Sequence, residues 1–576
     1  MGIGAASEAV LTAVRAKRIG VPVSVRIVDH SASEIDEVEP LLARNLEAAS
    51  QWLDADVSRL AALGDFQAGQ VSVLMEFRQG QTALVSAGTR GHGRPLLEVV
   101  VVGNRGILSW EPGQGTGGRG QGTGGRGERP IIDRDRAPSP GVRRLLDAVR
   151  RSLKSQSPVM LIGDVSPEDA RGSGQRAAGS GQIIDQQSSI INRRLIRTDP
   201  PYGVLLVAGA HTHQEGYAED LAADPRCRLI GVTDEPDVPE RRRALNEKLA
   251  RQLAVPLLPD LNQALAREDV HIVSICAEPE RRARLMVRCA EAGKHVYLDK
   301  PMTASVDQAE TVAAAIRTSG VVSQMFSQVH SSASTRLRRL LDSGSLGELK
   351  ALHFDLTFAK GPAGTVPIDK PRAEHEVPRH FERVDSKREL YNVGVYQLVL
   401  LDWLLGRRVR RVLAVTANYF FAEHRHNDME DYAVALMELE GGLTATLACG
   451  RTGWRSHPMG GMNRTTLIGD QGVASIDAYR PRLEVWADEN PWLPPKLHPQ
   501  DPMGFWKSTF EEVDAAPKQA WVSTGGAGKS DAAYFLDCIE HGRQSEVSAD
   551  RGAEVIKVLM AAYASAATGR FVTPAQ

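Results

Sequence analysis

The 576-residue chain has few cysteines, few aromatic residues and almost no net charge. Its five cysteines are scattered and never form a CxxC pair, which excludes a disulfide framework and a cysteine zinc site. Lys plus Arg number 69 and Asp plus Glu 71, a balance that argues against a dedicated nucleic-acid-binding protein. No apolar run approaches the roughly 18–20 residues of a membrane span. Charges interrupt the N-terminal apolar residues, so we expect no signal peptide and a cytoplasmic protein.

Glycine is abundant, with 53 residues, but it is concentrated rather than spread evenly. Residues 113–126 repeat the heptapeptide GQGTGGR, which has too little apolar surface to offset its chain entropy. We expect a disordered insertion there. A second Gly- and Ser-rich stretch ends at Asp-Pro-Pro, and it predicts a linker over residues 161–200.

Short apolar runs alternate with helical stretches between residues 201 and 325. This alternation is typical of parallel βαβ units, so we predict a doubly wound Rossmann-type sheet in an α/β domain. The expected strands are residues 203–208, 228–232, 271–276 and 295–298, and the expected helices are residues 214–224, 240–253 and 280–293.

From about residue 347 the apolar residues follow a period of two. That period predicts a large, mostly antiparallel open sheet with helices on one face, in an α+β domain over residues 326–576.

The N-terminal third repeats this C-terminal pattern. Residues 71–91 and 433–453 are identical at eight of 21 aligned positions, and the next strands agree in kind (99–111 with 465–478). Two weaker similarities match residues 11–28 with 398–415 and residues 142–152 with 534–543. We therefore expect residues 1–160 to be a degenerate copy of the C-terminal sheet domain.

The first strand of the α/β unit enters a turn that is a poor match to a dinucleotide-binding G-x-G-x-x-G. Only Gly209 fits, because His211 and Gln214 hold the other two glycine positions. Asp234 ends the second strand about 25 residues later, where a carboxylate can bind both ribose hydroxyls and repel a 2′-phosphate. This favours NAD over NADP, although a solvated loop aspartate is the simpler alternative.

The segment GKHVYLDKP delivers Asp299, Lys300 and Pro301 to the carboxyl edge of the sheet, where ligands bind in such folds. The ammonium of Lys300 can there hydrogen-bond a substrate hydroxyl or the carbonyl that it becomes.

Residues 201–576 resemble the Gfo/Idh/MocA family of NAD(P)-dependent oxidoreductases, which includes glucose–fructose oxidoreductase and inositol dehydrogenase. The segments AREDVHIVSICAEPE (266–280), AGKHVYLDKPMT (292–303), LLDSGSLGELKAL (340–352) and the tail carry the resemblance. Asp299-Lys300-Pro301 stands where the family has Glu-Lys-Pro. The resemblance implies a cofactor-binding set comprising Gly209, His211, Thr212, His213, Asp234, Cys276, Ala277, Glu278, Pro279, Asp299 and Lys300.

The family's second catalytic element is a glycine triplet followed by D-x-G-x-H. Here the spacing is kept, but Ser386-Lys387-Arg388 replaces the triplet, Asn392 the aspartate and Tyr396 the histidine. The resemblance implies that Tyr396 exchanges the hydroxyl proton beside Lys300, whose ammonium would lower the phenol pKa. Asn392 can bind a hydroxyl but cannot act as a base. The changed triplet indicates either an acidic or altered substrate, or a lost activity.

Two further clusters are weaker candidates. Trp454, Arg455 and His457 follow a sheet strand and could contact a sugar substrate. The alternation His424-x-His426-x-Asp428-x-Glu430 would place four metal-binding side chains on one face of a strand. We expect instead a solvated loop and no metal.

These observations predict an NAD-dependent oxidoreductase that transfers a hydride to or from a secondary alcohol carbon of a sugar, polyol or cyclitol-like molecule. The departures in the motifs keep two alternatives open, a non-catalytic nucleotide-binding scaffold and a partner-dependent regulatory subunit. No nucleic-acid or membrane partner is expected. Proteins of the family associate through the exposed face of the sheet domain, which implies either a homo-oligomer or an intrachain pseudo-dimer formed with the N-terminal copy.

Overall fold

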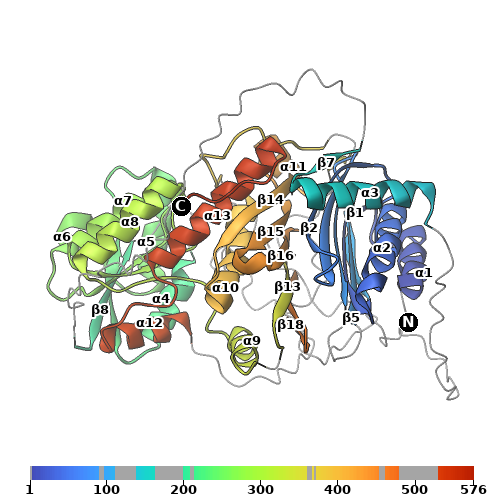
Figure 1. Cartoon of the computed structure of the whole chain (residues 1–576). Helices are drawn as coiled ribbons and strands as arrows, with labels where there is room; N and C mark the ends of the chain where they lie inside the picture. The colour runs from blue at the N-terminus through green and yellow to red at the C-terminus, as the bar shows by residue number, and fades with distance from the viewer. Residues whose placement is uncertain are drawn as a thin grey trace, which may run out of the picture.

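The structure is a computed structural model in which three sheets follow one another along the chain (Figure 1). It describes residues 3–89, 96–110, 138–161, 199–207, 213–344, 346–359, 366–368, 371–383, 385–452, 461–478 and 530–576. The Gly-rich repeat and the predicted linker therefore lie outside the described residues, apart from the ends of the linker. Among the described helices, none combines the length and the hydropathy needed to cross a bilayer.

The Rossmann-type sheet is parallel throughout, as predicted, with the strand order β12-β11-β10-β8-β9. Its strands are β8 (Tyr202–Val207), β9 (Cys227–Thr233), β10 (Ile272–Ile275), β11 (His295–Leu298) and β12 (Ser323–Met325). The helices between them are α4 (Gln214–Ala222), α5 (Glu240–Gln252), α6 (Leu261–Leu265), α7 (Pro279–Glu291) and α8 (Val306–Ser319). The sequence pattern missed β12 because its three residues, Ser-Gln-Met, form no apolar run.

The C-terminal sheet has the order β14-β15-β16-β13-β17-β18, and β13–β16 is its parallel pair. Its strands are β13 (Leu349–Phe358), β14 (Val409–Ala417), β15 (Tyr432–Leu439), β16 (Thr444–Arg451), β17 (Gly461–Gly469) and β18 (Val473–Asp477). Helices of this region are α9 (Ser332–Asp342), a π-helical turn η3 (Leu390–Gly394), α10 (Val395–Leu405), α11 (Ala422–His426), α12 (Asp531–Glu540) and α13 (Ala549–Thr568). The mostly antiparallel sheet is thus confirmed.

The N-terminal sheet has the order β6-β5-β1-β4-β3-β2-β7. Its strands are β1 (Pro22–Ala32), β2 (Val57–Asp65), β3 (Gln70–Phe77), β4 (Thr82–Thr89), β5 (Leu96–Gly103), β6 (Gly106–Trp110) and β7 (Val159–Met160), and helices α1 (Ile3–Arg15), α2 (Val38–Leu53) and α3 (Pro140–Ser155) accompany them. The parallel pair β1–β4 occupies the place that β13–β16 has in the C-terminal sheet. The first six strands therefore reproduce the C-terminal topology.

The repetition extends to single hydrogen bonds. Ser152 Oγ accepts from Ala62 N and donates to the carbonyl of Ser157. At the equivalent position Ser565 Oγ accepts from Ala414 N and donates to the carbonyl of Arg570. An ion pair joins Arg59 to Glu76 on β2 and β3, and its counterpart joins Arg411 to Glu438 on β14 and β15.

These hydrogen bonds correct two of the sequence matches. Because Ser152 corresponds to Ser565, α3 is equivalent to α13 and not to residues 534–543, most of which lie in α12 against the Rossmann-type domain. The match of residues 11–28 with 398–415 is also wrong, because β1 takes the place of β13 and β14 that of β2. The match of residues 71–91 with 433–453 is confirmed, since β3–β4 and β15–β16 pair in the same register.

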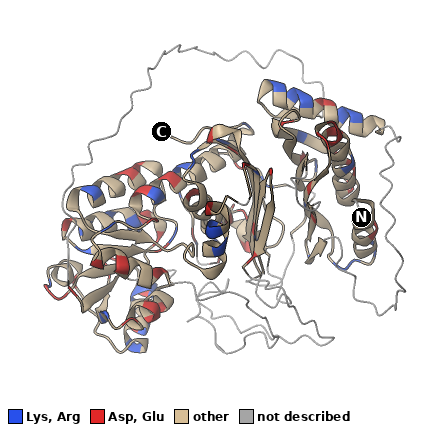
Figure 2. Cartoon of the chain, turned by 60° about the horizontal axis from the view of Figure 1, so that its bottom comes forward, with Lys and Arg blue, Asp and Glu red and all other residues tan. Residues whose placement is uncertain are grey.

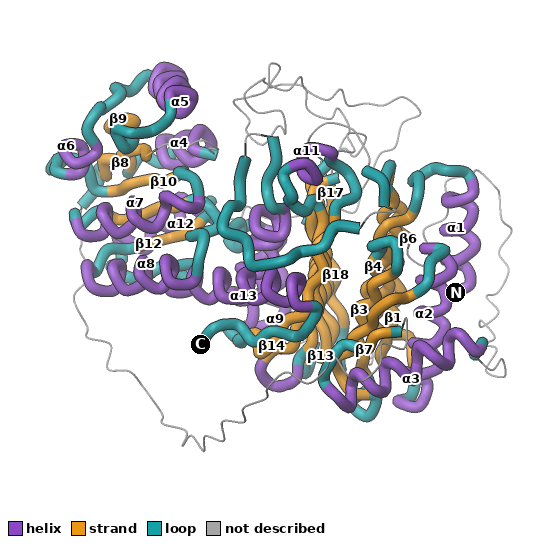
Figure 3. Tube along the Cα trace, turned by 90° about the horizontal axis from the view of Figure 1, so that it is seen from above, coloured by secondary structure: helices purple, strands orange, loops and turns teal. Residues whose placement is uncertain are grey.

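The two sheets pack face to face, as the two stacks of strands in Figure 3 show. Equivalent positions from both copies belong to this one core, among them Leu74 with its counterpart Leu436 and Ala61 with its counterpart Leu413. An isologous contact of this kind is the arrangement of a two-fold dimer. The strands are mostly uncharged along this contact (Figure 2), but Arg26 crosses it to Asp355 at 2.7 Å. One chain therefore contains the intrachain pseudo-dimer.

Removing residues 1–161 is expected to convert the chain into a self-associating species, because the truncation exposes the apolar face of the C-terminal sheet. Sedimentation velocity would measure this. A truncated chain that also carries Leu413→Lys and Leu436→Lys is the control, and it should return toward a monomer. A truncated chain that is monomeric and as stable as the full chain would contradict the role given to the N-terminal sheet.

Candidate active site

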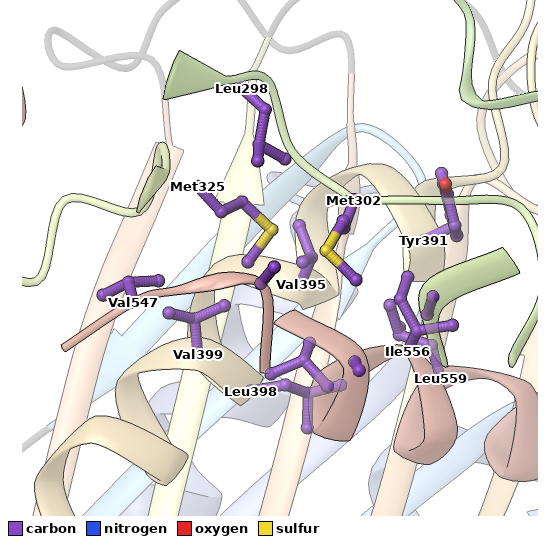
Figure 4. Packing of buried hydrophobic residues seen from close by; sticks show 14 of the residues in the cluster. Leu298, Met302, Met325, Tyr391, Val395, Leu398, Val399, Val547, Ile556 and Leu559 are labelled. Atoms are coloured by element: carbon purple, nitrogen blue, oxygen red, sulfur yellow. The ribbon is translucent and has the colours of Figure 1, made fainter. Parts of the chain in front are cut away.

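Lys300 is anchored where the Rossmann-type domain meets the C-terminal domain. It follows β11 directly, and both Lys300 and Asp299 are buried. On either side, Leu298 and Met302 reach into a core that also contains Tyr391, Leu398 and Ile556, the last three from the C-terminal domain (Figure 4). The Lys300–Pro301 peptide bond is cis. The backbone at Lys300 is therefore held by packing from both domains.

The three predicted catalytic residues meet at one place. Lys300 Nζ donates to the carbonyl oxygen of Asn392 at 2.6 Å and to its side-chain Oδ1 at 2.8 Å. The same nitrogen lies 4.7 Å from the ring centroid of Tyr396, on the first turn of α10. Nζ thus contacts the backbone and side-chain oxygens of Asn392 and the face of the Tyr396 ring. A lysine ammonium has three N–H donors, and the two hydrogen bonds to Asn392 use two of them.

Burial lowers the pKa of Lys300 to about 7. The carboxylate of Asp299 opposes this change, while the cation of Lys387 adds to it. A group with a pKa near the working pH is suited to give and take a proton. The structure therefore provides a lysine that exchanges its proton near neutrality.

Asp299 is held by three side chains of the Rossmann-type domain. Its carboxylate accepts from Tyr217 Oη at 2.7 Å and from Arg282 Nη2 at 2.9 Å, and it lies 3.1 Å from His213 Nδ1. Burial alone would raise its pKa, but His213 and Arg282 outweigh burial and hold the pKa far below its usual range. Asp299 is therefore an ionised anchor beside Lys300, and its predicted cofactor contact stays a prediction.

A buried network behind Asn392 was not foreseen from the sequence. Asn392 Nδ2 donates to Glu389 Oε2 at 3.2 Å, and Arg451 Nε donates to Glu389 Oε1 at 2.9 Å. His424 Nε2 lies 3.4 Å from the same oxygen. Since the amide nitrogen is used by Glu389, Oδ1 must face Lys300. The only local signal was that Glu389 precedes Asn392 by one helical turn.

The segment that replaces the glycine triplet is buried and internally neutralised. Lys387 pairs with Glu382 at 3.3 Å, and Arg388 contacts Glu374 at 3.1 Å and Glu430 at 3.0 Å. The two cations that the sequence adds here are therefore balanced by carboxylates of the same domain.

The His-x-His-x-Asp-x-Glu stretch does not form one face of a strand. Residues 422–426 are helical, and His424 points to Glu389. Glu430 is fully buried and accepts from Tyr563 Oη at 2.6 Å and from Leu390 N at 3.1 Å. The expectation of a solvated loop is wrong for His424 and Glu430, which brace the first turn before Asn392. No group of three His, Cys, Asp or Glu side chains in the described part of the chain is arranged to hold a metal ion.

On the nucleotide side, Asp234 lies at the end of β9 as predicted, with both carboxylate oxygens engaged. Oδ1 accepts from Arg281 Nη2 at 2.5 Å and from Glu235 N at 2.8 Å, and Oδ2 accepts from Asn246 Nδ2 at 2.9 Å. Burial raises the pKa of Asp234, against the opposing effect of Arg281. A carboxylate has about four lone-pair sites, so one hydroxyl can still be bound.

The other predicted cofactor-binding residues that the structure describes lie at the carboxyl edge of the Rossmann-type sheet. Cys276 and Ala277 follow β10, and Glu278 and Pro279 begin α7. Gln214, in the third glycine position, donates its amide to the carbonyls of Val207 and Ser274 and so links the ends of β8 and β10. Outside the described residues lie the predicted positions Gly209, His211, Thr212, Trp454, Arg455 and His457.

Comparisons with known proteins match both of the domains that meet at Lys300. Residues 205–327 match the model described as "Oxidoreductase family, NAD-binding Rossmann fold", and residues 334–475 match "GFO/IDH/MocA C-terminal domain". The chain is 30% identical over 228 residues to dTDP-3,4-didehydro-2,6-dideoxy-alpha-D-glucose 3-reductase of Streptomyces violaceoruber, which is 38% of this chain and 57% of the relative. It is 23% identical over 270 residues to scyllo-inositol 2-dehydrogenase (NAD(+)) of Bacillus subtilis strain 168, covering 46% of this chain and 70% of the relative.

Among solved structures, GenD2 from gentamicin A biosynthesis, in complex with NAD, is similar with a TM-score of 0.49 and 22% identity, covering 67% of this chain and 99% of that chain. The chain spans just over half the length of the first curated relatives that it matches, 57% and 51%. The two family models match consecutive segments that lie in the Rossmann-type domain and in the domain of the C-terminal sheet. Through residues 205–327 and 334–475, the chain belongs to the GFO/IDH/MocA family of NAD(P)-binding oxidoreductases.

Proposed function

We propose that the protein transfers a hydride between NAD(H) and a secondary alcohol or ketone of a sugar, polyol or cyclitol-like substrate. The observation that carries this proposal is the buried Lys300, with a pKa near 7, held against Asn392 and Tyr396 at the carboxyl edge of the Rossmann-type sheet. Relatives whose names include a sugar-nucleotide reductase and an inositol dehydrogenase support the substrate class. The five unpaired cysteines support a reducing, cytoplasmic location.

The residues present fit a dinucleotide. Asp234 would bind a ribose hydroxyl, and the segment from Cys276 to Pro279, which ends in the first turn of α7, would border the pyrophosphate and the nicotinamide. When bound, the nicotinamide ring accepts or supplies the hydride.

The chain's own residues handle the proton. Lys300 Nζ, in its neutral form, accepts the hydroxyl proton as the alcohol becomes a carbonyl, and in its charged form returns the proton during reduction. Asn392 fixes the direction of the ammonium, and Glu389 fixes Asn392. The hydroxyl of Tyr396 is the second donor to the substrate oxygen, and its ring restricts access of water to Nζ.

A dehydrogenase screen over sugars, sugar nucleotides and cyclitols tests the proposal, with NADH formation as the readout. We expect turnover of at least one ring alcohol. Binding of NADH without turnover of any of them would favour the alternative, a nucleotide-binding scaffold or regulatory subunit. Two observations favour this alternative: the carboxylate of Asp234 is already bound by Arg281, and the glycine triplet of the family is replaced by Ser386-Lys387-Arg388.

Cofactor choice gives a second test at Asp234. We expect Asp234→Ser to weaken NADH binding by about 10–100-fold, because it removes a charged hydrogen-bond acceptor worth about 1.5–3 kcal/mol. Binding of NADPH should improve in the same variant, since the carboxylate that repels a 2′-phosphate is removed and Arg281 loses one of its three carboxylate partners. Nicotinamide fluorescence titrations measure both, with the exposed Asp237→Ser as control. Unchanged NADH affinity in Asp234→Ser would show that Asp234 does not bind the ribose of the cofactor.

The pH profile tests Lys300 itself. Oxidation of the alcohol needs the neutral amine, so its rate should rise with pH through about 7, while reduction of the carbonyl should fall through the same range. Lys387→Gln removes a cation that lowers the pKa of Lys300, and its profile should move to higher pH. Initial rates measured across pH for both directions check this. Coincident profiles for the two proteins would show that Lys300 does not set the profile.

A further inference from the structure

The turn between β3 and β4 of the N-terminal sheet touches the C-terminal domain at residues that lie outside the strands of the C-terminal sheet. Gly80 in this turn has φ +82°, and a Cβ atom placed on it would lie 2.5 Å from Cβ and 3.2 Å from Cα of Pro371. The carbonyl oxygen of Gly80 accepts a hydrogen bond from the buried Tyr419 Oη at 2.7 Å. The turn thus fits against Pro371 and Tyr419 with no space for a side chain.

Pro371 is followed by the side chains that brace the catalytic segment. Arg372 donates to both oxygens of Glu374, at 2.8 and 2.9 Å. Arg388 reaches the same carboxylate, and it also donates to Glu430 at 3.0 Å. Glu430 in turn accepts from Leu390 N, the start of the turn that carries Asn392. A continuous series of contacts between charged side chains therefore connects the segment after Pro371 to the turn that holds Asn392, the hydrogen-bond partner of Lys300.

Tyr419 is connected to Glu430, and so to the start of η3, by a second set of contacts. Its backbone N donates to Asp431 Oδ1 at 2.8 Å, and Asp431 also accepts from the backbone of Phe420 and Phe421. Asp431 is adjacent to Glu430 in the chain. Both residues touched by the Gly80 turn are thus connected to the carboxylate that holds the start of η3.

The C-terminal copy has a turn of the same length without the contact. Gly442 is the counterpart of Gly80, and Leu439 N bonds to the carbonyl of Leu443 as Phe77 N bonds to that of Gln81. Gly442 has φ +79°, but a Cβ atom there would meet nothing within 4 Å. The two glycines therefore have nearly the same positive φ, but only Gly80 is in close contact with another segment.

We propose that the β3–β4 turn of the N-terminal sheet is a positioning element of the active site, supplied from within the same chain. It holds Pro371 and Tyr419 so that residues 371–383 and 385–392 keep Asn392 in contact with Lys300. Gly80 is a positioning residue and touches no reacting group. The kinetic part of the test rests on the proposed hydride transfer, and the structural part does not.

The test compares full-length Gly80→Ala and Gly442→Ala by hydrogen–deuterium exchange. Both carry the same left-handed strain, but only Gly80→Ala forces the turn away from Pro371. We expect amides in residues 371–383 and 385–392 to exchange at least about tenfold faster in Gly80→Ala than in Gly442→Ala. NADH affinity should be equal in the two variants, because the dinucleotide set lies in the Rossmann-type domain.

The kinetic readout separates positioning from general destabilisation. Gly80→Ala should lower kcat by about tenfold or more with little change in KM for the dinucleotide, while Gly442→Ala keeps wild-type kcat. Tyr419→Phe removes the hydrogen bond to Gly80 without altering the glycine, and it should change exchange and kcat in the same direction by less. It also decides the matter if Gly80→Ala does not fold.

Equal exchange in these segments for Gly80→Ala and Gly442→Ala, or wild-type exchange there in Tyr419→Phe, would overturn the proposal. A wild-type protein without any turnover would count against the proposed function alone, since the exchange comparison needs no substrate.

Discussion

Replacing Lys300 with methionine is expected to reduce turnover by about 10²–10⁴-fold, the range for loss of a positioned acid–base group. Methionine keeps the apolar stem but removes all three donors, so the substrate oxygen loses its proton partner. NADH affinity should change little, because the nucleotide contacts proposed above lie at Asp234 and along residues 276–279. The fold should survive, since burial already disfavours the charged amine at this position.

Lys294→Met is the matched control for this experiment. Lys294 lies one residue before β11, at the opposite end of that strand from Lys300, and its Nζ donates to the carbonyls of Arg267 and Val270. Initial rates, NADH fluorescence and thermal unfolding should be measured on both variants. If Lys300→Met kept a rate similar to that of Lys294→Met, Lys300 would not be the group that handles the proton.

Replacing Arg26 with methionine is expected to cost about 3–5 kcal/mol of unfolding free energy, as breaking a buried ion pair does. Arg26 lies between Asp355, at 2.7 Å, and Glu98, at 3.3 Å, and all three side chains are at most 4% exposed. Without it, the carboxylates of both copies remain buried where the two sheets meet. Arg59→Met is the control, because the Arg59–Glu76 pair is partly exposed and should be worth no more than about 1 kcal/mol.

The loss should depend on pH in a known direction. Burial raises the pKa of Asp355 to about 6 even with Arg26 present. The native state therefore holds a proton that the unfolded chain releases above about pH 4, so Asp355 lowers stability as pH rises from about 4 to 6. Removing Arg26 raises this pKa further and extends the window upward. Urea unfolding should show a larger deficit for Arg26→Met at about pH 8 than at about pH 5, and a deficit as small as that of Arg59→Met would contradict the account.

The sequence revealed the parts of the molecule that depend on local patterns. The strand before Lys300 is a buried apolar run that ends at a Lys-Pro pair, and a ligand-binding edge follows from parallel topology. The register of the two copies followed from residues 71–91 and 433–453, since their hairpins share spacing and glycines. Asn392 and Tyr396 were found through the resemblance to the family, because the spacing of its motif is kept although neither is the residue that the family pattern has there.

The parts that were missed depend on contacts between distant segments. Glu389, His424 and Arg451 meet behind Asn392 from three separate elements, and no local period marks them. The α3 helix was matched to the wrong helix because amphipathic helices of similar composition resemble one another. Only the hydrogen bonds of Ser152 and Ser565 to their sheets identify the equivalent pair. The contact of Gly80 with Pro371 joins residues nearly 300 positions apart and has no sequence signature.

The most direct test of the central claim is a single-turnover label transfer. A ring alcohol that the screen identifies is deuterated at the reacting carbon and incubated with excess enzyme and NAD, and deuterium in the nicotinamide ring is measured by mass spectrometry. We predict deuterium on the nicotinamide in the wild-type protein and transfer at least about 10²-fold slower in Lys300→Met. If the wild-type protein binds NADH but places no deuterium on the nicotinamide, it does not perform the hydride transfer proposed for this site.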